Sequence, residues 1–206
     1  MVPQKFSYLG RNQQLWDLGL GFKDLLDQQV VQQKIQQLDK ELDLVMLAEQ
    51  FDASLVLLAD TLSWPLRNMT SLKLNARKDS AIERITPKAS VMLKDWLWAD
   101  YMLYNHFQRK LEHKKCSFGL RNLEENVRKL EEYNKEVRRD CVKEVISDSK
   151  QLSEDFIPWS DDVLGFSINE EKKFCKHFAM SELPFIEELR TLQLERLRRW
   201  QKKNKA

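Results

Sequence analysis

The sequence predicts a helix-rich α/β fold with few strands and several long helices. Only 5 Gly and 5 Pro occur among its 206 residues, which argues against an all-β chain with many tight turns. Leu, Gln, Glu, Lys and Arg are frequent, and these residues favour helix. The apolar fraction of 42% is enough for a core. The length allows one domain or a large part of a bigger one.

One strand–loop–helix unit is expected in the first half of the chain. The apolar run Leu42–Ala48 is short and bounded by charge, which is typical of a buried strand. A helix is expected to open at Phe51 and to end before Trp64-Pro65, because proline cannot continue the hydrogen-bond ladder. Such a unit is the building block of parallel α/β sheets. Ahead of it, Asp24 is expected to cap a helix that runs to about Glu41.

The rest of the chain is predicted to be mainly helical. The alternating stretch Leu72–Arg77 indicates a strand or an extended loop. A long helix is expected to begin at Pro87, a favourable first-turn residue, and Gly119 separates it from a second helix that runs to about Val145. A polar loop is expected at 147–162, and two shorter helices are expected after it, at 169–180 and 184–202.

The charge balance excludes a general nucleic-acid binder. The formal net charge is only +2, whereas basic charge dominates the affinity of such proteins. Basic residues gather locally at Arg109–Lys115 and at Arg196–Lys205. One interpretation is a pair of solvated helix ends; the other is attraction to a membrane surface or an anionic glycolipid. The sequence shows no secretory signal at Met1–Phe6 and no run of about 20 apolar residues.

Standard catalytic and metal-binding signatures are not found in the sequence. It contains no phosphate loop, dinucleotide fingerprint, nucleophile elbow, H-E-x-x-H or C-x-x-C motif. His106, His113 and Cys116 are spaced so that they share one helical face, and zinc accepts such ligands. A zinc site would need a fourth ligand, and Gly119 ends the helix nearby. We therefore expect a polar face and no metal.

The segment Leu42–Arg77 resembles the galactose 3-O-sulfotransferase family. That family shows F-x-L-V-x-x-x-E-x-F-D-E-S-L-x-L-L, then L-L-C-W-x-L, then K-L-N-A-R. This chain departs from the pattern at Ala53, where the family usually has Glu, and at Ser63, where it often has Cys. The stretch Leu15–Leu20 and the stretch Leu103–Phe107, similar to L-Y-x-H-F-N, extend the likeness. The matching positions of the central block are Leu44, Val45, Glu49, Phe51, Asp52, Ser54, Leu55, Leu57, Leu58, Trp64, Leu66, Lys73, Leu74, Asn75, Ala76 and Arg77.

The resemblance implies the C-terminal portion of a P-loop-like sulfotransferase fold, with a βα-containing part at 1–80 and a helical part at 87–206. It implies transfer of sulfuryl from 3′-phosphoadenylyl sulfate (PAPS) to the 3-hydroxyl of galactose on galactosylceramide or other glycans. It further implies a lumenal Golgi enzyme with an N-terminal membrane anchor. The family's donor loop, K-T-H-K-x-x-[ST]-T, does not occur in this sequence, so we expect a partial product that is inactive alone. The alternative is a non-catalytic helical interaction module derived from that scaffold.

Within the family block, Lys73, Asn75 and Arg77 are candidates for binding phosphate, sulfate or sugar hydroxyls. Alternation places all three on one side of an extended segment, with two cations flanking an amide. The alternative is an exposed strand edge with protective charges.

Three further residues are candidates for catalysis. Glu49 and Asp52 follow the C-terminal end of the expected strand, where open α/β sheets bind their ligands. Either carboxylate suits galactose hydroxyls or a base, although a simple helix N-terminus is the competing interpretation. His106 has the chemistry of a base, and a polar residue at a helix edge is the alternative.

Cysteines and a glycosylation sequon bear on the compartment. Cys116, Cys141 and Cys175 allow one disulfide in three pairings. Cys141 and Cys175 fall where family members carry cysteines, so the resemblance implies this pair in a lumenal protein; three free thiols are the alternative. Asn68 begins the N-x-[ST] sequon Asn68-Met69-Thr70.

Overall fold

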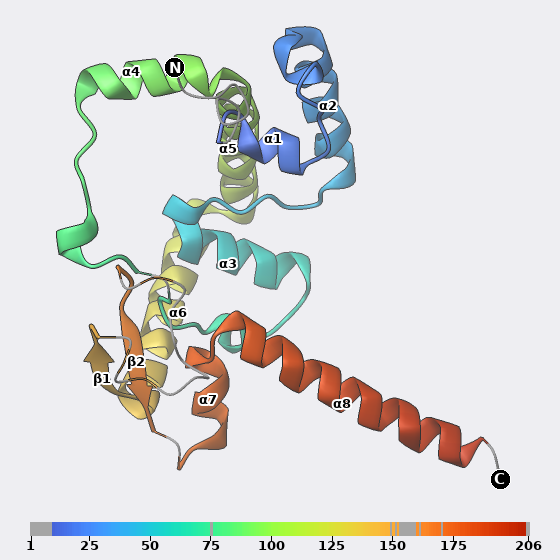
Figure 1. Cartoon of the computed structure of the whole chain (residues 1–206), viewed down its shortest axis with the longest axis vertical. Coiled ribbons are helices and arrows are strands. Elements are labelled where there is room, and N and C mark those ends of the chain that lie inside the picture. Colours follow the sequence, from blue (N-terminus) through green and yellow to red (C-terminus); the bar gives the residue numbers. More distant parts are fainter. Residues whose placement is uncertain are drawn as a thin grey trace. The chain divides into compact units, whose positions relative to one another are not determined.

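The computed structural model describes residues 10–74, 76–148, 150, 152, 160, 162–169 and 171–204. Within these residues the chain is mostly helical and has one two-stranded sheet (Figure 1). The predicted helix-rich α/β class, with few strands and several long helices, is confirmed. The chain divides into two compact units, Met1–Met69 with Arg84–Leu130, and Thr70–Glu83 with Glu131–Ala206.

All the regular secondary structure described in the first unit is helical. Its α-helices are α1 (Gln13–Asp17), α2 (Gln28–Glu41), α3 (Phe51–Thr61), α4 (Pro87–Trp96), α5 (Trp98–Phe118) and the first part of α6 (Leu120–Cys141). Three 3₁₀ turns accompany them: η2 (Asp24–Leu26), η3 (Ala48–Gln50) and η4 (Leu66–Met69). No helix of the described residues is both long enough and apolar enough to cross a bilayer.

Local chemistry sets several of these helix ends. The Asp27 carboxylate accepts hydrogen bonds from the first N–H groups of α2, so the cap lies three residues beyond the predicted Asp24. Pro87 occupies the first turn of α4, as predicted, behind the Thr86 cap. Gly119 ends α5 with φ of 92°, a conformation that glycine adopts readily. The single long helix expected from Pro87 is instead interrupted at Leu97.

Reciprocal capping joins α1 to the start of α5. The Asn12 side-chain oxygen accepts from the N–H groups of Ala99 and Asp100, at 3.1 and 3.2 Å. The Asp100 carboxylate accepts from the N–H groups of Gln14 and Leu15, both at 3.0 Å. Two helix N-termini, whose first N–H groups lack partners within their own helices, thus satisfy each other. The exchange lets both polar side chains be buried.

Two apolar clusters stabilise the first unit, and α5 contributes to both. One joins α1, α2 and α5 through residues such as Leu15, Val31 and Phe107. The other joins α3, α5 and α6 through residues such as Val56 and Leu111. Burial of these side chains leaves the remaining faces of α5 as the surface on which polar residues gather.

The predicted strand at Leu42–Ala48 is wrong, and with it the parallel βα unit. The backbone is extended at Leu42 and Leu47, but no described strand pairs with it. The Leu47 N–H donates instead to Ser54 Oγ at 3.2 Å. Successive side chains point to opposite sides of extended backbone. Val45 therefore packs on the first cluster, and its two neighbours Leu44 and Met46 pack on the second. Burial between helices explains the apolar run without a sheet.

The second unit contains the sheet. Strand β1 (Val142–Ile146) pairs antiparallel with β2 (Gly165–Ile168), with Val145 opposite Phe166. Helices α7 (Lys173–Ala179) and α8 (Glu182–Lys203) follow, close to the predicted C-terminal pair, and η5 (Asp79–Ala81) is a short turn. The helix predicted to reach Val145 therefore ends at Cys141, where the strand begins. Residues of both strands and α7 form a third apolar cluster with Leu72.

The stretch Leu72–Arg77 is only partly extended. A turn occurs at Leu74, whose N–H donates to the Leu72 carbonyl at 2.8 Å. Arg77 then forms an isolated antiparallel bridge with Val163. The continuous alternation predicted for this segment is therefore broken. Most of the polar loop expected at 147–162 lies outside the described residues.

Candidate functional site

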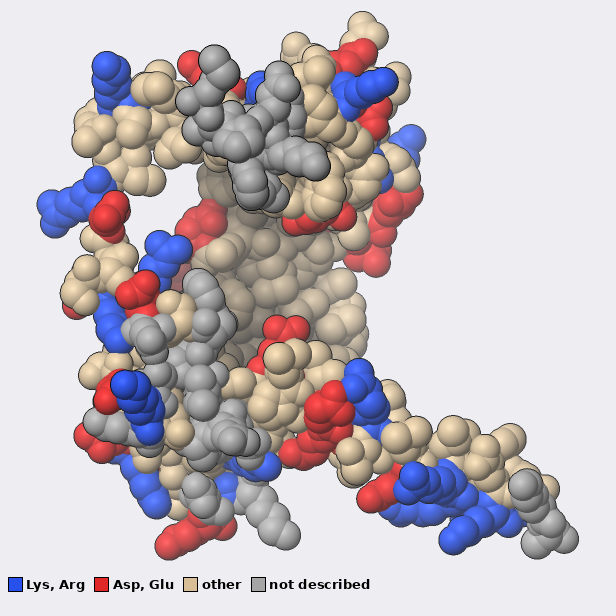
Figure 2. Space-filling model, in the orientation of Figure 1, with Lys and Arg blue, Asp and Glu red and all other residues tan. Residues whose placement is uncertain are grey.

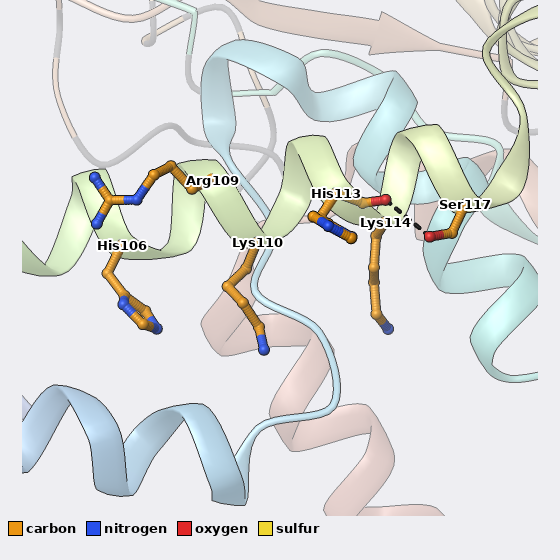
Figure 3. Close-up of a pocket in the computed structure, with 6 residues that line it drawn as sticks. All are labelled: His106, Arg109, Lys110, His113, Lys114 and Ser117. Carbon is orange, nitrogen blue, oxygen red and sulfur yellow. Dashed lines mark hydrogen bonds between the residues drawn. The ribbon is translucent and has the colours of Figure 1, made fainter.

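A row of basic side chains lies along one exposed face of α5. His106, Arg109, Lys110, His113, Lys114 and Ser117 recur at three- and four-residue steps, so they share one side of the helix. They line a pocket of about 420 Å³ (Figure 3). The Ser117 hydroxyl donates to the His113 carbonyl at 3.0 Å, within the same helix. The buried Leu103, Phe107 and Leu111 lie next to this row on α5, on the side of Lys110 and Lys114.

Asp39 of α2 faces this row and contacts two of its members. Its Oδ1 lies 3.0 Å from Lys110 Nζ and 3.3 Å from His106 Nε2. Lys110 Nζ also donates to Asp39 Oδ2, at 3.3 Å. The Lys110 ammonium, and then the His106 imidazole, hold the pKa of Asp39 below its ordinary value against an opposing effect of burial. Asp39 is therefore a carboxylate that holds the imidazole and the ammonium together.

The contact between Asp39 and His106 has a specific form. Oδ1 and Nε2 are closed to solvent, and neither makes a hydrogen bond of acceptable angle with a described residue. At 3.3 Å the two atoms attract chiefly by charge when the imidazole carries its second proton. Phe107 meets the same ring edge-on, with centroids 5.1 Å apart. The imidazole is thus held between a carboxylate and an aromatic ring.

A smaller pocket of about 40 Å³ shares Lys110 and Lys114 with the basic row. Asp39 and residues 42–45, the extended segment after α2, supply the other lining together with Phe107 and Leu111. Here the segment that was expected to be a strand forms a wall beside α5. It therefore helps to shape the site, although not as the edge of a sheet.

Glu49 is bound to the same helix through Tyr104. The Tyr104 hydroxyl donates a short hydrogen bond to Glu49 Oε1. This bond lowers the pKa of Glu49 and raises the pKa of Tyr104. A carboxylate with a lowered pKa is a weaker proton acceptor, so Glu49 is better suited to accept a hydrogen bond than to act as a base.

A polar cluster next to Glu49 fixes η3 against α5. Gln50 Nε2 donates to Glu112 Oε1 at 3.0 Å, and Lys115 Nζ donates to both Gln50 Oε1 and Glu112 at 2.9 Å. Lys115, followed by Gln50, lowers the pKa of Glu112. The cluster therefore holds Glu49 in place on the surface of α5.

The predicted site residues fall into two sets. Glu49 in η3, Asp52 in the first turn of α3 and His106 on α5 belong to the first unit. Lys73 and Arg77, both of them exposed, belong to the second, and Asn75 lies outside the described residues. Of the first set, His106 lines the pocket on α5, and Glu49 is hydrogen-bonded to Tyr104 of the same helix.

Some residues of the site were not among the sequence candidates. Asp39 and Tyr104, the partners of His106 and Glu49, are the main ones. Lys110 could have been found, because it follows His106 by one helical turn. Asp39 gives no such signal, since it is separated from Lys110 by 71 residues. Among the described residues, no group of three or more His, Cys, Asp or Glu side chains is placed to hold a metal ion.

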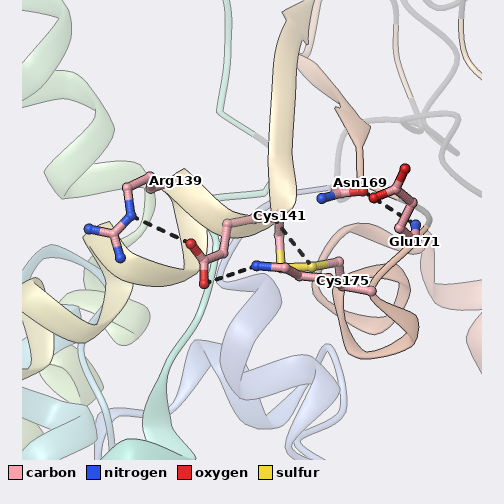
Figure 4. The surroundings of a disulfide bond; sticks show 7 residues. Arg139, Cys141, Asn169, Glu171 and Cys175 are labelled. Carbon is pink, nitrogen blue, oxygen red and sulfur yellow. Dashed lines mark hydrogen bonds and ion pairs between the residues drawn. A yellow bond between two sulfur atoms is a disulfide. The ribbon is translucent and has the colours of Figure 1, made fainter.

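The disulfide joins Cys141 to Cys175, the pair that the resemblance implies (Figure 4). It connects the end of α6 to α7, with Cα atoms 5.0 Å apart, and both residues are fully buried. Next to it, Lys172 and then Arg139 lower the pKa of Asp140. Cys116 is free and exposed. Asn68, in η4, is exposed.

Nearly all of the chain matches one family of known proteins. The model of the family described as galactose-3-O-sulfotransferase matches residues 3–193. Galactose-3-O-sulfotransferase 2 of Sus scrofa is 28% identical over 194 residues, covering 89% of this chain and 49% of the relative. Galactosylceramide sulfotransferase of Mus musculus is 29% identical over 188 residues, covering 82% and 43%. The chain spans about half the length of the curated relatives that it matches. No solved structure matches it.

Proposed function

The chain belongs to the galactose-3-O-sulfotransferase family, and we propose that it forms part of an enzyme that transfers sulfuryl from PAPS to the 3-hydroxyl of galactose. The acceptor would be galactosylceramide or another galactose-terminated glycan. The observation that carries the proposal is the family match across residues 3–193, which includes every residue of the α5 site.

The reaction needs a proton acceptor and positive charge. The acceptor oxygen attacks sulfur, the bond from sulfur to the donor's phosphate oxygen breaks, and the hydroxyl proton must leave. We assign proton acceptance to His106, because Asp39 Oδ1 lies 3.3 Å from Nε2 and can stabilise the imidazolium that forms. With Nε2 turned to Asp39, the proton would be taken at Nδ1.

The neighbouring cations suit the anionic groups of the donor. Lys110, Arg109 and Lys114 lie within one or two helical turns of His106 and line the same pocket. Preorganised cations stabilise charge on sulfate and phosphate oxygens as it develops. Glu49, held by Tyr104, and the nearby Asp52 would accept hydrogen bonds from sugar hydroxyls. Lys73, Asn75 and Arg77 remain proposed contacts to donor or acceptor, in the second unit.

We also propose that the enzyme acts on the lumenal side of the Golgi membrane. Two features support an oxidising compartment: the buried disulfide between Cys141 and Cys175, since such bonds persist there, and the exposed sequon residue Asn68. The donor-loop pattern is not found in this sequence. We therefore propose that transfer requires a further segment to supply that loop.

A transfer assay tests the function directly. The chain alone is compared with a chimaera in which it replaces the matching part of mouse galactosylceramide sulfotransferase. With labelled PAPS and galactosylceramide, the chimaera should form labelled lipid and the chain alone should not. A folded chimaera without activity would contradict the proposed function and favour a non-catalytic module. Transfer by the chain alone would contradict only the need for another segment.

A further inference from the structure

Helix α8 exposes an apolar stripe along its whole length. Its members are Ile186, Leu189, Leu192, Leu197 and Trp200, all of them exposed. At about 100° per residue, these positions fall within an arc of about 140°. Leu197 is 49% exposed and Trp200 is 64% exposed, and no described residue of α8 is buried. The stripe therefore lacks a partner within the described part of the chain.

The other side of α8 is strongly basic towards its C-terminal end. Figure 2 shows Lys and Arg atoms along one side of this helix and uncharged atoms along the other. At the same 100° per residue, Arg198 and Lys202 lie opposite the stripe, Arg199 lies about 20° beyond its edge at Leu192, and Arg196 and Lys203 fall within the arc near that edge. The long side chains of Arg196 and Lys203 can cover apolar surface while their charges reach outward.

Most of these cations have no acidic partner in the described part of the chain. Arg199 pairs with Glu195 at 3.1 Å, and Arg190 pairs with Glu187 one turn earlier. Among the described residues, Arg196, Arg198, Lys202 and Lys203 make no ion pair. The last turns of α8 therefore present unneutralised positive charge beside an apolar surface.

The basic end of α8 lies outside the family match. The match stops at residue 193, and Arg196, Arg198, Arg199, Lys202 and Lys203 all follow it. Packing common to the family therefore gives no account of this end of the helix. Exposed Leu and Trp side chains beside unpaired Arg and Lys side chains indicate that this end of α8 binds a separate partner.

We propose that α8 lies flat on an anionic lipid bilayer, with the stripe in the interface and the basic side chains at the headgroups. A helix with Leu and Trp on one face and Arg and Lys on the other has this preference. Negatively charged headgroups attract each basic residue held near the surface. Trp200 suits the interface because its ring is large and its N–H is polar.

Charge argues against self-association through the stripe. Two copies of α8 in contact through the stripe would bring Arg196 and Lys203, which lie within the arc of each copy, next to one another. Like charges beside an apolar seam oppose pairing, whereas seams that pair carry complementary charges. An anionic surface neutralises the same groups. The inference does not depend on sulfuryl transfer.

Vesicle binding by the full chain tests the proposal. The chain should sediment with phosphatidylcholine vesicles that contain phosphatidylserine, and much less with phosphatidylcholine alone. The double variant Arg198→Glu/Lys202→Glu should bind the anionic vesicles at least about tenfold more weakly. Added salt should weaken the wild-type binding, because it screens exposed charges.

A matched control separates local from overall charge. Lys129→Glu/Lys135→Glu makes the same change in net charge at two positions of α6, and should leave binding within about twofold. Brominated acyl chains should quench tryptophan emission, and the quenching should fall in Trp200→Phe. Equal loss of binding in both double variants would overturn the proposal. So would quenching unchanged in Trp200→Phe, or binding to an acidic peptide as tight as binding to vesicles.

Discussion

Asp39 is the residue on which the α5 site depends most, because it contacts both Lys110 and His106. Its lowered pKa follows from these neighbours, with Lys110 as the main cause. A carboxyl whose pKa is lower in the folded state than in the unfolded chain stabilises the fold above its unfolded pKa. That contribution is lost as the pH falls through the folded pKa.

Asp39→Asn tests this link. At neutral pH the variant should have a lower free energy of unfolding than the wild type. The difference should shrink as the pH falls below about 4, where the unfolded carboxyl takes up its proton. Urea unfolding at several pH values measures it. Lys110→Met removes the main partner of Asp39 and should also reduce the pH dependence of the free energy of unfolding. A stability deficit of the Asp39→Asn variant that stays constant with pH would contradict the account.

The sequence proposed His106 and Glu49 as candidates, but it did not indicate their partners. Glu49 was proposed because it follows the expected strand, and His106 because an imidazole can act as a base. The contact of His106 with Asp39, and of Tyr104 with Glu49, depends on which helices pack together. The sequence also left the role of Glu49 open, and the lowered pKa that Tyr104 causes now favours hydrogen bonding over proton acceptance.

At the scale of elements, helix ends were predictable where one residue decides them. Pro87 and Gly119 act through their own backbone preferences, so α4 begins and α5 ends where expected. The prediction of a strand at Leu42–Ala48 was wrong because burial between helices, rather than a sheet, explains its apolar run. Strand β1 was missed because its partner, β2, comes from a distant segment.

The disulfide is the covalent link between two elements of the second unit. It closes a loop of sequence separation 34, and restricting the unfolded chain in this way stabilises the fold by about 2–4 kcal/mol. Cys141→Ser/Cys175→Ser should lower the free energy of unfolding by that amount, measured by denaturant titration. The matched control, Cys116→Ser, changes an exposed free thiol and should have an effect below about 0.5 kcal/mol. Equal effects would contradict the assignment.

At the scale of the whole molecule, the helical character follows from composition, whereas the division into units does not. The boundary between the units falls within α6, a continuous helix that no sequence signal interrupts. The family match covers both units. The site on α5 belongs to one of them, so the proposed function assigns its proton acceptor to the first unit.

The most direct test of the central claim is the effect of His106→Ala on sulfuryl transfer by the chimaera, compared with His113→Ala. Both residues line the same pocket of α5, but only His106 contacts Asp39. Loss of a general base should lower kcat/KM by about 10²–10⁴ in His106→Ala, with little change in His113→Ala. Equal, small effects of the two substitutions would contradict the role assigned to His106.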